Sequence, residues 1–158
     1  MNPLLNVNRL LTRFALILVL LLAPASQTYA QLVTRVVDGD TLIVQEIWRV
    51  RLIGVDTPET VDPRRPVQFF GKEASGFTSR MAEGKVVRLE FDVERTDRFG
   101  RTLAYVYLPD GTFLNAELVK QGYGHAYTQF PFRYLEQFLG YEHEARQTGL
   151  GLWRGSQR

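Results

Sequence analysis

Short runs of alternating apolar and polar residues dominate the chain and predict β-strands. Residues 32–37 alternate in this way and end at Asp38-Gly39, a dipeptide typical of a tight turn between strands. Residues 41–44 and 47–55 are rich in Val, Ile and Leu, which favour strands. We therefore expect the domain to begin with a meander of three antiparallel strands.

The region after these strands predicts a mixture of helices and strands. A loop with three prolines over 57–66 comes first. Apolar residues at 70, 74, 77 and 81 then have helical spacing, which predicts a helix over 69–82 that ends near Gly84. The remaining predicted elements are strands over 85–91 and 101–108, a short helix over 116–121 capped by Asn115, and a last helix over 133–148.

This order of elements indicates an α+β protein that consists mainly of a small β-barrel with three helices. The OB-fold, a five-stranded Greek-key barrel that binds oligonucleotides, agrees with the order. Periodicity alone leaves other α+β arrangements open. Residues 31–158 are numerous enough for a single domain with its own hydrophobic core.

The first 30 residues have the parts of a secretory signal peptide. Two arginines supply a positive flank, residues 14–23 form an apolar run of ten, and small residues precede a cleavage point after Ala30. A second cleavage point follows Ala25. An uncleaved membrane anchor is the alternative, although the run is shorter than the roughly 20 residues that span a bilayer. We therefore expect a secreted or periplasmic domain over 31–158.

The signal segment changes how the net charge is interpreted. The chain has 19 basic and 17 acidic residues and a pI near 9.0, which suggests an acidic partner. Arg9 and Arg13 lie in the first 30 residues, which contain no Asp or Glu, so 17 residues of each sign remain. The overall charge of the domain therefore does not identify a partner. The absence of cysteine excludes a disulfide scaffold, thiolate metal ligands and a cysteine nucleophile.

Three turn-like segments concentrate charged residues: DGDT at 38–41, RLIGVDTPE at 51–59 and RTDRFGR at 95–101. Each segment alone is an ordinary turn, strand end or solvated loop. Together they would bring two aspartates to neighbouring strand ends, where the carboxylates repel each other unless a cation joins them. A ligand set that consists only of oxygen atoms suits calcium or magnesium. Two arginines beside such a cation form a clamp for a phosphate. A glutamate is then left over as a general base.

These segments lie in a series of five motifs that resembles the calcium-dependent thermonuclease family, also called staphylococcal nuclease-like. The motifs are DGDT, RLIGVDTPET, RTDRFGRTLAYVY, NAELVKQG and GLW, in this order between residues 32 and 153. The resemblance implies a five-stranded barrel with three helices. It also implies hydrolysis of DNA or RNA phosphodiester bonds that leaves 3′-phosphate ends.

The resemblance assigns roles to matching positions. Asp40 and Asp56 match calcium carboxylates, and Thr57 matches the residue whose backbone carbonyl completes the Ca²⁺ site. Arg51 and Arg101 match the arginines that hold the scissile phosphate and stabilise the transition state. Glu59 matches the general base that acts on a water. In this scheme calcium acts as a Lewis acid and the arginines supply preorganised positive charge.

Some positions depart from the family pattern. Phe99 stands where the type member has a tyrosine that bonds a nucleotide phosphate, while the adjacent Arg98 keeps a basic residue. Tyr127 matches a base-stacking tyrosine, in a stretch after Gly122 that is about two residues shorter than in the type member. The basic pair Arg64-Arg65 lies in a loop and either contacts a substrate backbone or belongs to the solvated surface.

Two functions follow from these residues. The first is an exported calcium-dependent nuclease that acts as a monomer on DNA or RNA, with no stable protein partner and no membrane contact after signal cleavage. The alternative is a non-catalytic nucleic-acid-binding OB-fold module. All of the matched calcium, arginine and glutamate positions are retained, which favours the enzyme.

Overall fold

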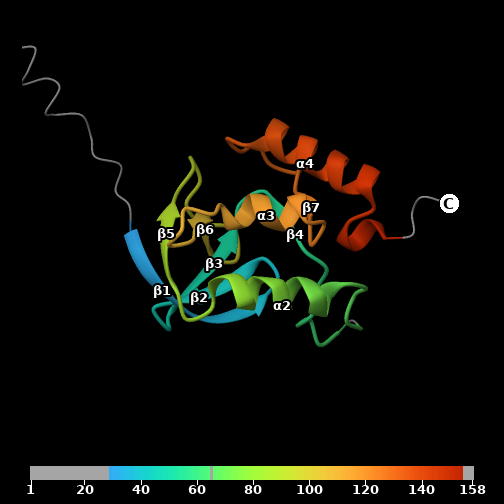
Figure 1. Cartoon of the computed structure of the whole chain (residues 1–158). Coiled ribbons are helices and arrows are strands. Elements are labelled where there is room, and N and C mark those ends of the chain that lie inside the picture. Colours follow the sequence, from blue (N-terminus) through green and yellow to red (C-terminus); the bar gives the residue numbers. More distant parts are fainter. Residues whose placement is uncertain (1–28, 65, 155–158) are drawn as a thin grey trace, which may run out of the picture.

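Five strands close into a β-barrel in the computed structural model, which describes residues 29–64 and 66–154 (Figure 1). Around the barrel they are β1 (Tyr29–Asp38), β2 (Thr41–Val44), β3 (Trp48–Leu52), β6 (Thr102–Tyr107) and β5 (Val86–Glu90). β3 and β6 are parallel, and the other neighbouring pairs are antiparallel. The expected α+β class and five-stranded OB-fold barrel are thus confirmed.

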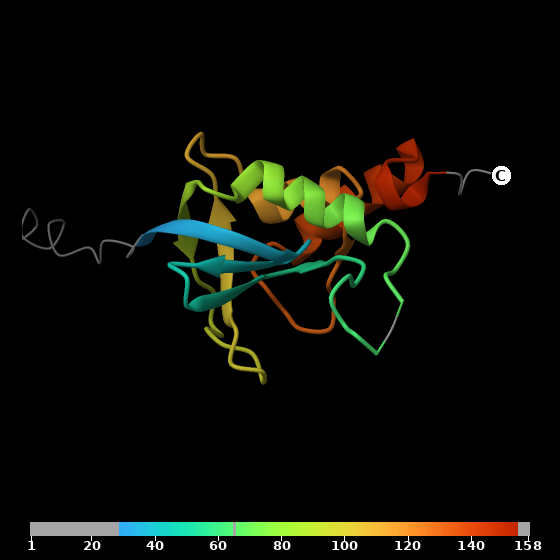
Figure 2. The same cartoon turned by 90° about the horizontal axis from the view of Figure 1, so that it is seen from below.

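In the part of the chain that the structure describes, three α-helices accompany the barrel, as predicted. They are α2 (Gly71–Ala82), α3 (Leu114–Lys120) and α4 (Leu135–Thr148), and a short 3-10 turn, η1 (Gly151–Trp153), follows the last. α2 packs against β1, and α3 contacts both other helices, so that it lies between them (Figures 1 and 2). Within the described residues, no helix is long and apolar enough to cross a membrane.

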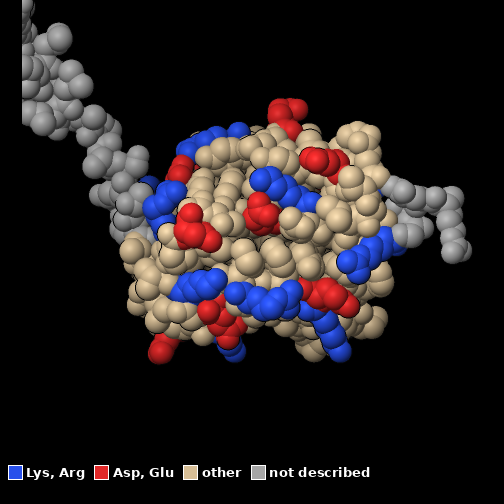
Figure 3. All heavy atoms as spheres, viewed as in Figure 1, with Lys and Arg blue, Asp and Glu red and all other residues tan. Residues whose placement is uncertain are grey.

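The hydrophobic core fills the barrel and the space beneath the helices. Its fully buried members include Val33, Leu42, Val50, Leu89, Val106, Leu114, Leu118 and Phe138. On the face shown in Figure 3, the described Lys and Arg side chains are interspersed with Asp and Glu. This mixture agrees with the equal numbers of basic and acidic residues counted after position 30.

The strand predicted over 47–55 is broken in the structure. β3 ends at Leu52, and after a turn the chain continues as β4 (Val55–Asp56), which pairs with β7 (His125–Ala126) in a separate two-stranded sheet. Gly54 lies in this turn at φ +76°, and a Cβ there would be 2.5 Å from the ring of Phe132. The turn therefore requires glycine. Because of it, strand alternation does not govern how Asp56 lies relative to β3.

The prediction that Asn115 caps a helix is wrong. Asn115 is the second residue of α3, is fully buried, and uses its side chain to bond other parts of the backbone. The N-cap position is occupied by Phe113, whose side chain forms no capping hydrogen bond. The polar amide that favours asparagine at helix caps can also bond backbone groups from a buried position, so the sequence did not separate the two roles.

The predicted signal peptide over 1–30 falls almost entirely outside the described residues. Only its last two residues are described, and they begin β1, where Tyr29 pairs with Leu89 and Ala30 pairs with Arg88 of β5. Cleavage after Ala30 would remove both residues from the barrel. Cleavage after Ala25 would keep them.

Candidate active site

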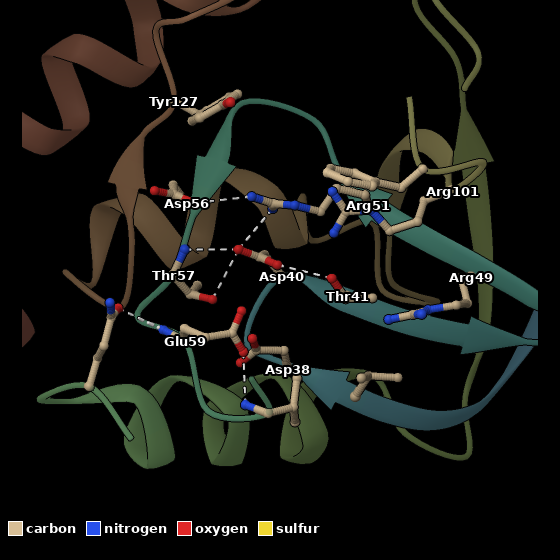
Figure 4. Close-up of a pocket in the computed structure, with 14 residues that line it drawn as sticks. Asp38, Asp40, Thr41, Arg49, Arg51, Asp56, Thr57, Glu59, Arg101 and Tyr127 are labelled. Carbon is tan, nitrogen blue, oxygen red and sulfur yellow. Dashed lines mark hydrogen bonds and ion pairs between the residues drawn. The ribbon is translucent and has the colours of Figure 1, made fainter. Parts of the chain in front are cut away.

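A pocket of about 400 Å³ lies beside β1, β2 and β3 and gathers residues from distant parts of the sequence (Figure 4). Eight of the nine predicted site residues line it, and the exception is Arg98. The eight are Asp40, Arg51, Asp56, Thr57, Glu59, Phe99, Arg101 and Tyr127. The fold therefore brings together the three charged segments that the sequence singled out.

Arg51, near the end of β3, bonds both predicted calcium carboxylates. Its Nη1 lies 2.8 Å from Oδ2 of Asp40, and its Nη2 lies 3.1 Å from Oδ1 of Asp56. The side chains of Arg51 and Asp40 are 12% and 7% exposed, so this ion pair is largely removed from water. Because a buried charge is tolerated only with a partner, the guanidinium acts here as the cation that holds the two carboxylates.

Thr57 bonds the same oxygen of the Asp40 carboxylate that Arg51 contacts. Its N–H and its Oγ1 hydroxyl both donate to Asp40 Oδ2, at 2.9 and 3.0 Å. The close approach depends on Gly39, because a Cβ at that position would lie 2.7 Å from Thr57 Oγ1. The DGDT turn thus needs its glycine so that Thr57 can reach Asp40.

Asp38, the first residue of the same turn, is a buried carboxyl that the sequence analysis did not assign. Its Oδ1 accepts hydrogen bonds from the N–H of Gly39 and from the hydroxyls of Thr60 and Ser75. Burial raises the pKa of Asp38 to about 6, and the neighbouring charge of Asp40 adds to the shift. The Asp38 carboxyl therefore loses its proton at a higher pH than an ordinary aspartate.

Glu59, the predicted general base, lies at the other side of the pocket next to Asp38 (Figure 4). Its Oε1 accepts hydrogen bonds from the N–H groups of Thr60 and Val61, at 2.9 and 2.8 Å. Partial burial alone would raise the pKa of Glu59, but the hydrogen bonds from Val61, Asp38 and Thr60 outweigh it and lower the pKa. The carboxylate is therefore held in place and ionised at neutral pH.

Arg101 is oriented by Asp97, four residues earlier in the loop before β6. The Arg101 Nε lies 2.6 Å from Asp97 Oδ2, while the N–H groups of Arg101 and Phe99 both donate to Asp97 Oδ1 at 2.9 Å. One carboxylate thus fixes both the arginine and the loop that carries Phe99. Phe99 is 69% exposed, and the guanidinium groups of Arg98 and Arg101 lie 4.7 and 5.5 Å from its ring centre.

The other predicted substrate residues are more peripheral. Tyr127 follows β7, and the guanidinium of Arg51 lies 6.0 Å from its ring centre. Arg64 forms an ion pair with Asp62 at 2.8 Å and is 84% exposed, while Arg65 lies outside the described residues. Arg64 does not line the described pocket.

The oxygen donors around Arg51 are of the kind that a calcium ion requires. Carboxylate and carbonyl oxygens are the ligands that calcium prefers, and the Arg51 guanidinium shows that Asp40 and Asp56 face one common cation. Over the residues that the structure describes, no group of three or more Asp, Glu, His or Cys side chains could hold a metal ion. A calcium ion here would thus depend on two carboxylates, a carbonyl and water.

The structure adds pocket residues that the sequence analysis missed. They are Val37, Asp38, Thr41, Arg49, Val61 and Gln68. Two signals in the sequence point to some of them. The run Arg49-Val50-Arg51 alternates on a strand and places both arginines on one face, and the DGD triplet places two carboxylates at one turn.

Comparison with known proteins gives consistent matches. A family model described as staphylococcal nuclease homologue matches residues 49–155. The chain is 46% identical over 131 residues to a thermonuclease of Staphylococcus hyicus, which covers 80% of this chain and 76% of the relative. A thermonuclease of Staphylococcus intermedius is 48% identical over 128 residues, covering 77% and 74%. Endonuclease YncB of Bacillus subtilis is 39% identical over 128 residues, covering 77% and 60%.

Proposed function

The chain belongs to the family of staphylococcal nuclease homologues, and on that premise we propose that it is an exported, calcium-dependent nuclease. Its substrates are the phosphodiester bonds of DNA or RNA, and its products carry 3′-phosphate ends. The observation that carries the proposal is the bridge from Asp40 through Arg51 to Asp56. This bridge supports the proposal because two carboxylates meet an arginine, a side chain suited to phosphate, within one pocket.

In the proposed reaction, metal binding and phosphate binding belong to different residues. Asp40, Asp56 and the carbonyl of Thr57 would hold a calcium ion, which would supply Lewis-acid stabilisation of the phosphate charge. Arg51 and Arg101 donate hydrogen bonds to the phosphate oxygens, where negative charge accumulates in the transition state.

Glu59 takes a proton from the attacking water. Its lowered pKa means that the carboxylate is ionised, and so able to accept that proton, at neutral pH. The water oxygen bonds to phosphorus and the bond from phosphorus to the 5′ oxygen breaks. The 5′ oxygen then takes up a proton from solvent. These steps leave a 3′-phosphate and a 5′-hydroxyl.

The test uses purified protein and a plasmid substrate, with calcium or with an excess of the chelator EGTA. Degradation should require calcium, and unchanged degradation in EGTA would contradict the metal assignment. Arg51→Gly and Arg101→Gly should each lower kcat/KM more than 100-fold, because the phosphate charge loses a donor in the transition state. A loss below tenfold, about 1.4 kcal/mol, would contradict the arginine clamp. Arg35→Gly is the control, because Arg35 is exposed and lies outside the described pocket.

The same experiment separates the enzyme from a non-catalytic binding module. A binding module would slow the migration of the plasmid in a gel mobility assay and would leave it uncut both with calcium and in EGTA. Export is tested by sequencing the N-terminus of the protein recovered from culture medium. A start at Gln31 or Ser26 identifies the cleavage point, and a protein that stays with the membrane fraction would favour the anchor.

A further inference from the structure

Arg49 is a third arginine in the pocket, and it differs from the other two in having no ionic partner among the residues that the structure describes. Arg51 is bonded to two carboxylates, and Arg101 is bonded to Asp97. Among residues 29–64 and 66–154, no side chain forms an ion pair or a hydrogen bond with the Arg49 guanidinium. An exposed arginine that has no ionic partner in the described part of the chain is available to an anion from outside the protein.

The position of Arg49 on β3 directs it to this pocket. Val50 and Leu52 are buried in the barrel core, so Arg49 and Arg51 lie on the opposite face of the strand. Two residues along a strand are separated by about 6.6 Å. Figure 4 shows the guanidinium end of Arg49 directed toward Thr41 and the middle of the pocket.

Arg49 and Tyr127 lie at opposite sides of the pocket, with Arg51 between them (Figure 4). Tyr127 offers a ring on which a base can stack, and Arg49 offers a phosphate contact. A nucleic acid strand bound through Arg51 and Arg101 would extend from the ring past these two arginines toward Arg49. The next phosphate of the strand would then meet the unpaired guanidinium.

We propose that Arg49 forms a second phosphate subsite, which binds the phosphodiester next to the one that is cleaved. The proposal rests on the nuclease function proposed above, because it assigns a further part of the substrate to the same pocket. Contacts of this kind fix the register of a nucleic acid strand and carry no base preference. The enzyme should therefore favour substrates with at least two phosphodiester bonds.

The kinetic test compares the dinucleotide TpT, which has one phosphodiester bond, with the trinucleotide TpTpT, which has two. Arg49→Ala should lower kcat/KM for TpTpT about tenfold, through a higher KM, and change kcat/KM for TpT less than twofold. Arg49→Lys should lie between, because it keeps the charge and loses the bidentate geometry. Equal losses on both substrates would overturn the assignment to a neighbouring phosphate.

Arg35→Ala is the matched control. Arg35 pairs with Ile43, which in turn pairs with Arg49, so the two arginines lie in one row across β1, β2 and β3. Arg35 is also exposed but lies outside the described pocket lining. Arg35→Ala should change neither KM nor the ratio of kcat/KM for TpTpT to kcat/KM for TpT. A loss equal to that of Arg49→Ala would overturn the proposal in favour of general surface charge.

A binding measurement separates failure of this proposal from failure of the proposed function. Binding of fluorescent (dT)₁₀ is measured with calcium in a Glu59→Gln background over a series of salt concentrations, so that the proposed metal is present and cleavage is not required. The slope of log affinity against log salt should fall by about 0.7 when Arg49→Ala is added, the value for one lost single-strand phosphate contact. An unchanged slope would overturn the subsite. A reduced slope, found while the protein with Glu59 intact cuts nothing, would support the subsite and reject the nuclease.

Discussion

Replacing Asn115 by alanine is expected to lower the free energy of unfolding by about 3–4 kcal/mol. Asn115 is fully buried in α3. Its Oδ1 accepts from the N–H of Val106 at 2.9 Å, and its Nδ2 donates to the carbonyls of Ile53 and Ala104 at 2.9 and 3.1 Å. One amide thus joins α3 to β6 and to the turn that separates Arg51 from Asp56.

The magnitude follows from these three bonds. Each buried hydrogen bond contributes roughly 1 kcal/mol net, and a buried group left without its partner costs a further 1–3 kcal/mol. The carbonyl of Ala104 keeps a second donor, the N–H of Ile53 at 3.0 Å. The largest added cost therefore comes from the N–H of Val106, which belongs to a fully buried residue.

Urea unfolding in EGTA measures the effect, with the fluorescence of Trp48 and Trp153 as the signal and circular dichroism as the second probe. The midpoint should shift while the slope of the transition stays unchanged. A loss below about 1 kcal/mol would refute the view that these bonds hold the turn and the barrel together.

Asn115→Asp provides an isosteric comparison. Aspartate keeps the acceptor for Val106 but, when ionised, directs negative charge at two carbonyl oxygens. Burial should raise its pKa, so the folded state binds a proton that the unfolded state releases. Its stability relative to wild type should therefore be lowest at pH 8 and recover as the pH falls toward 5. Equal stability differences at both pH values would contradict this explanation.

Three further predictions concern other residues. Asp97→Asn removes the charge that orients Arg101, so kcat/KM on TpTpT should fall about tenfold in single-turnover assays, and an unchanged rate would contradict the orienting role. Burial raises the pKa of Asp38 to about 6, so its contribution to stability is present below pH 4 and lost as the pH rises to 6. Asp38→Asn in EGTA should therefore melt higher than wild type at pH 8 and similarly at pH 4, and a lower melting temperature at pH 8 would count against it. Glu46 lies in the β2–β3 turn at φ 64°, so Glu46→Gly should gain about 1 kcal/mol and melt a few degrees higher by calorimetry, whereas no gain would show that the turn is unstrained.

The barrel was predictable because its signals are local. Alternation over 32–37 and the turn at Asp38-Gly39 define the first hairpin without reference to the rest of the chain. The broken strand at Gly54 was not predictable in this way. Its cause is the ring of Phe132, which is distant in sequence and occupies the place of a side chain at the turn.

In the candidate site, too, the features that local motifs define were predictable, and those that depend on contacts between distant residues were not. Its carboxylates and arginines were identified from motifs, but strand alternation could not show whether Arg51 and Asp56 meet, because Asp56 lies at the end of the predicted strand. The turn at Gly54 brings the two side chains to 3.1 Å. Asp97 was missed because its role depends on its contact with Arg101, which residue types and spacing do not encode. For Arg49, alternation with Arg51 indicates a shared strand face but not what its guanidinium contacts.

The charges of the pocket explain why substrate and calcium are expected to bind together. Four carboxylates, Asp38, Asp40, Asp56 and Glu59, face three arginines in the described lining, and two of these arginines are already paired. A phosphate entering this pocket alone would meet negative charge and would have to break the ion pairs of Arg51. A divalent cation between Asp40 and Asp56 would offset both costs, since it neutralises the carboxylates and frees the guanidinium. Because coupling between two ligands is reciprocal, a bound nucleotide should tighten calcium binding by the same factor that calcium tightens nucleotide binding.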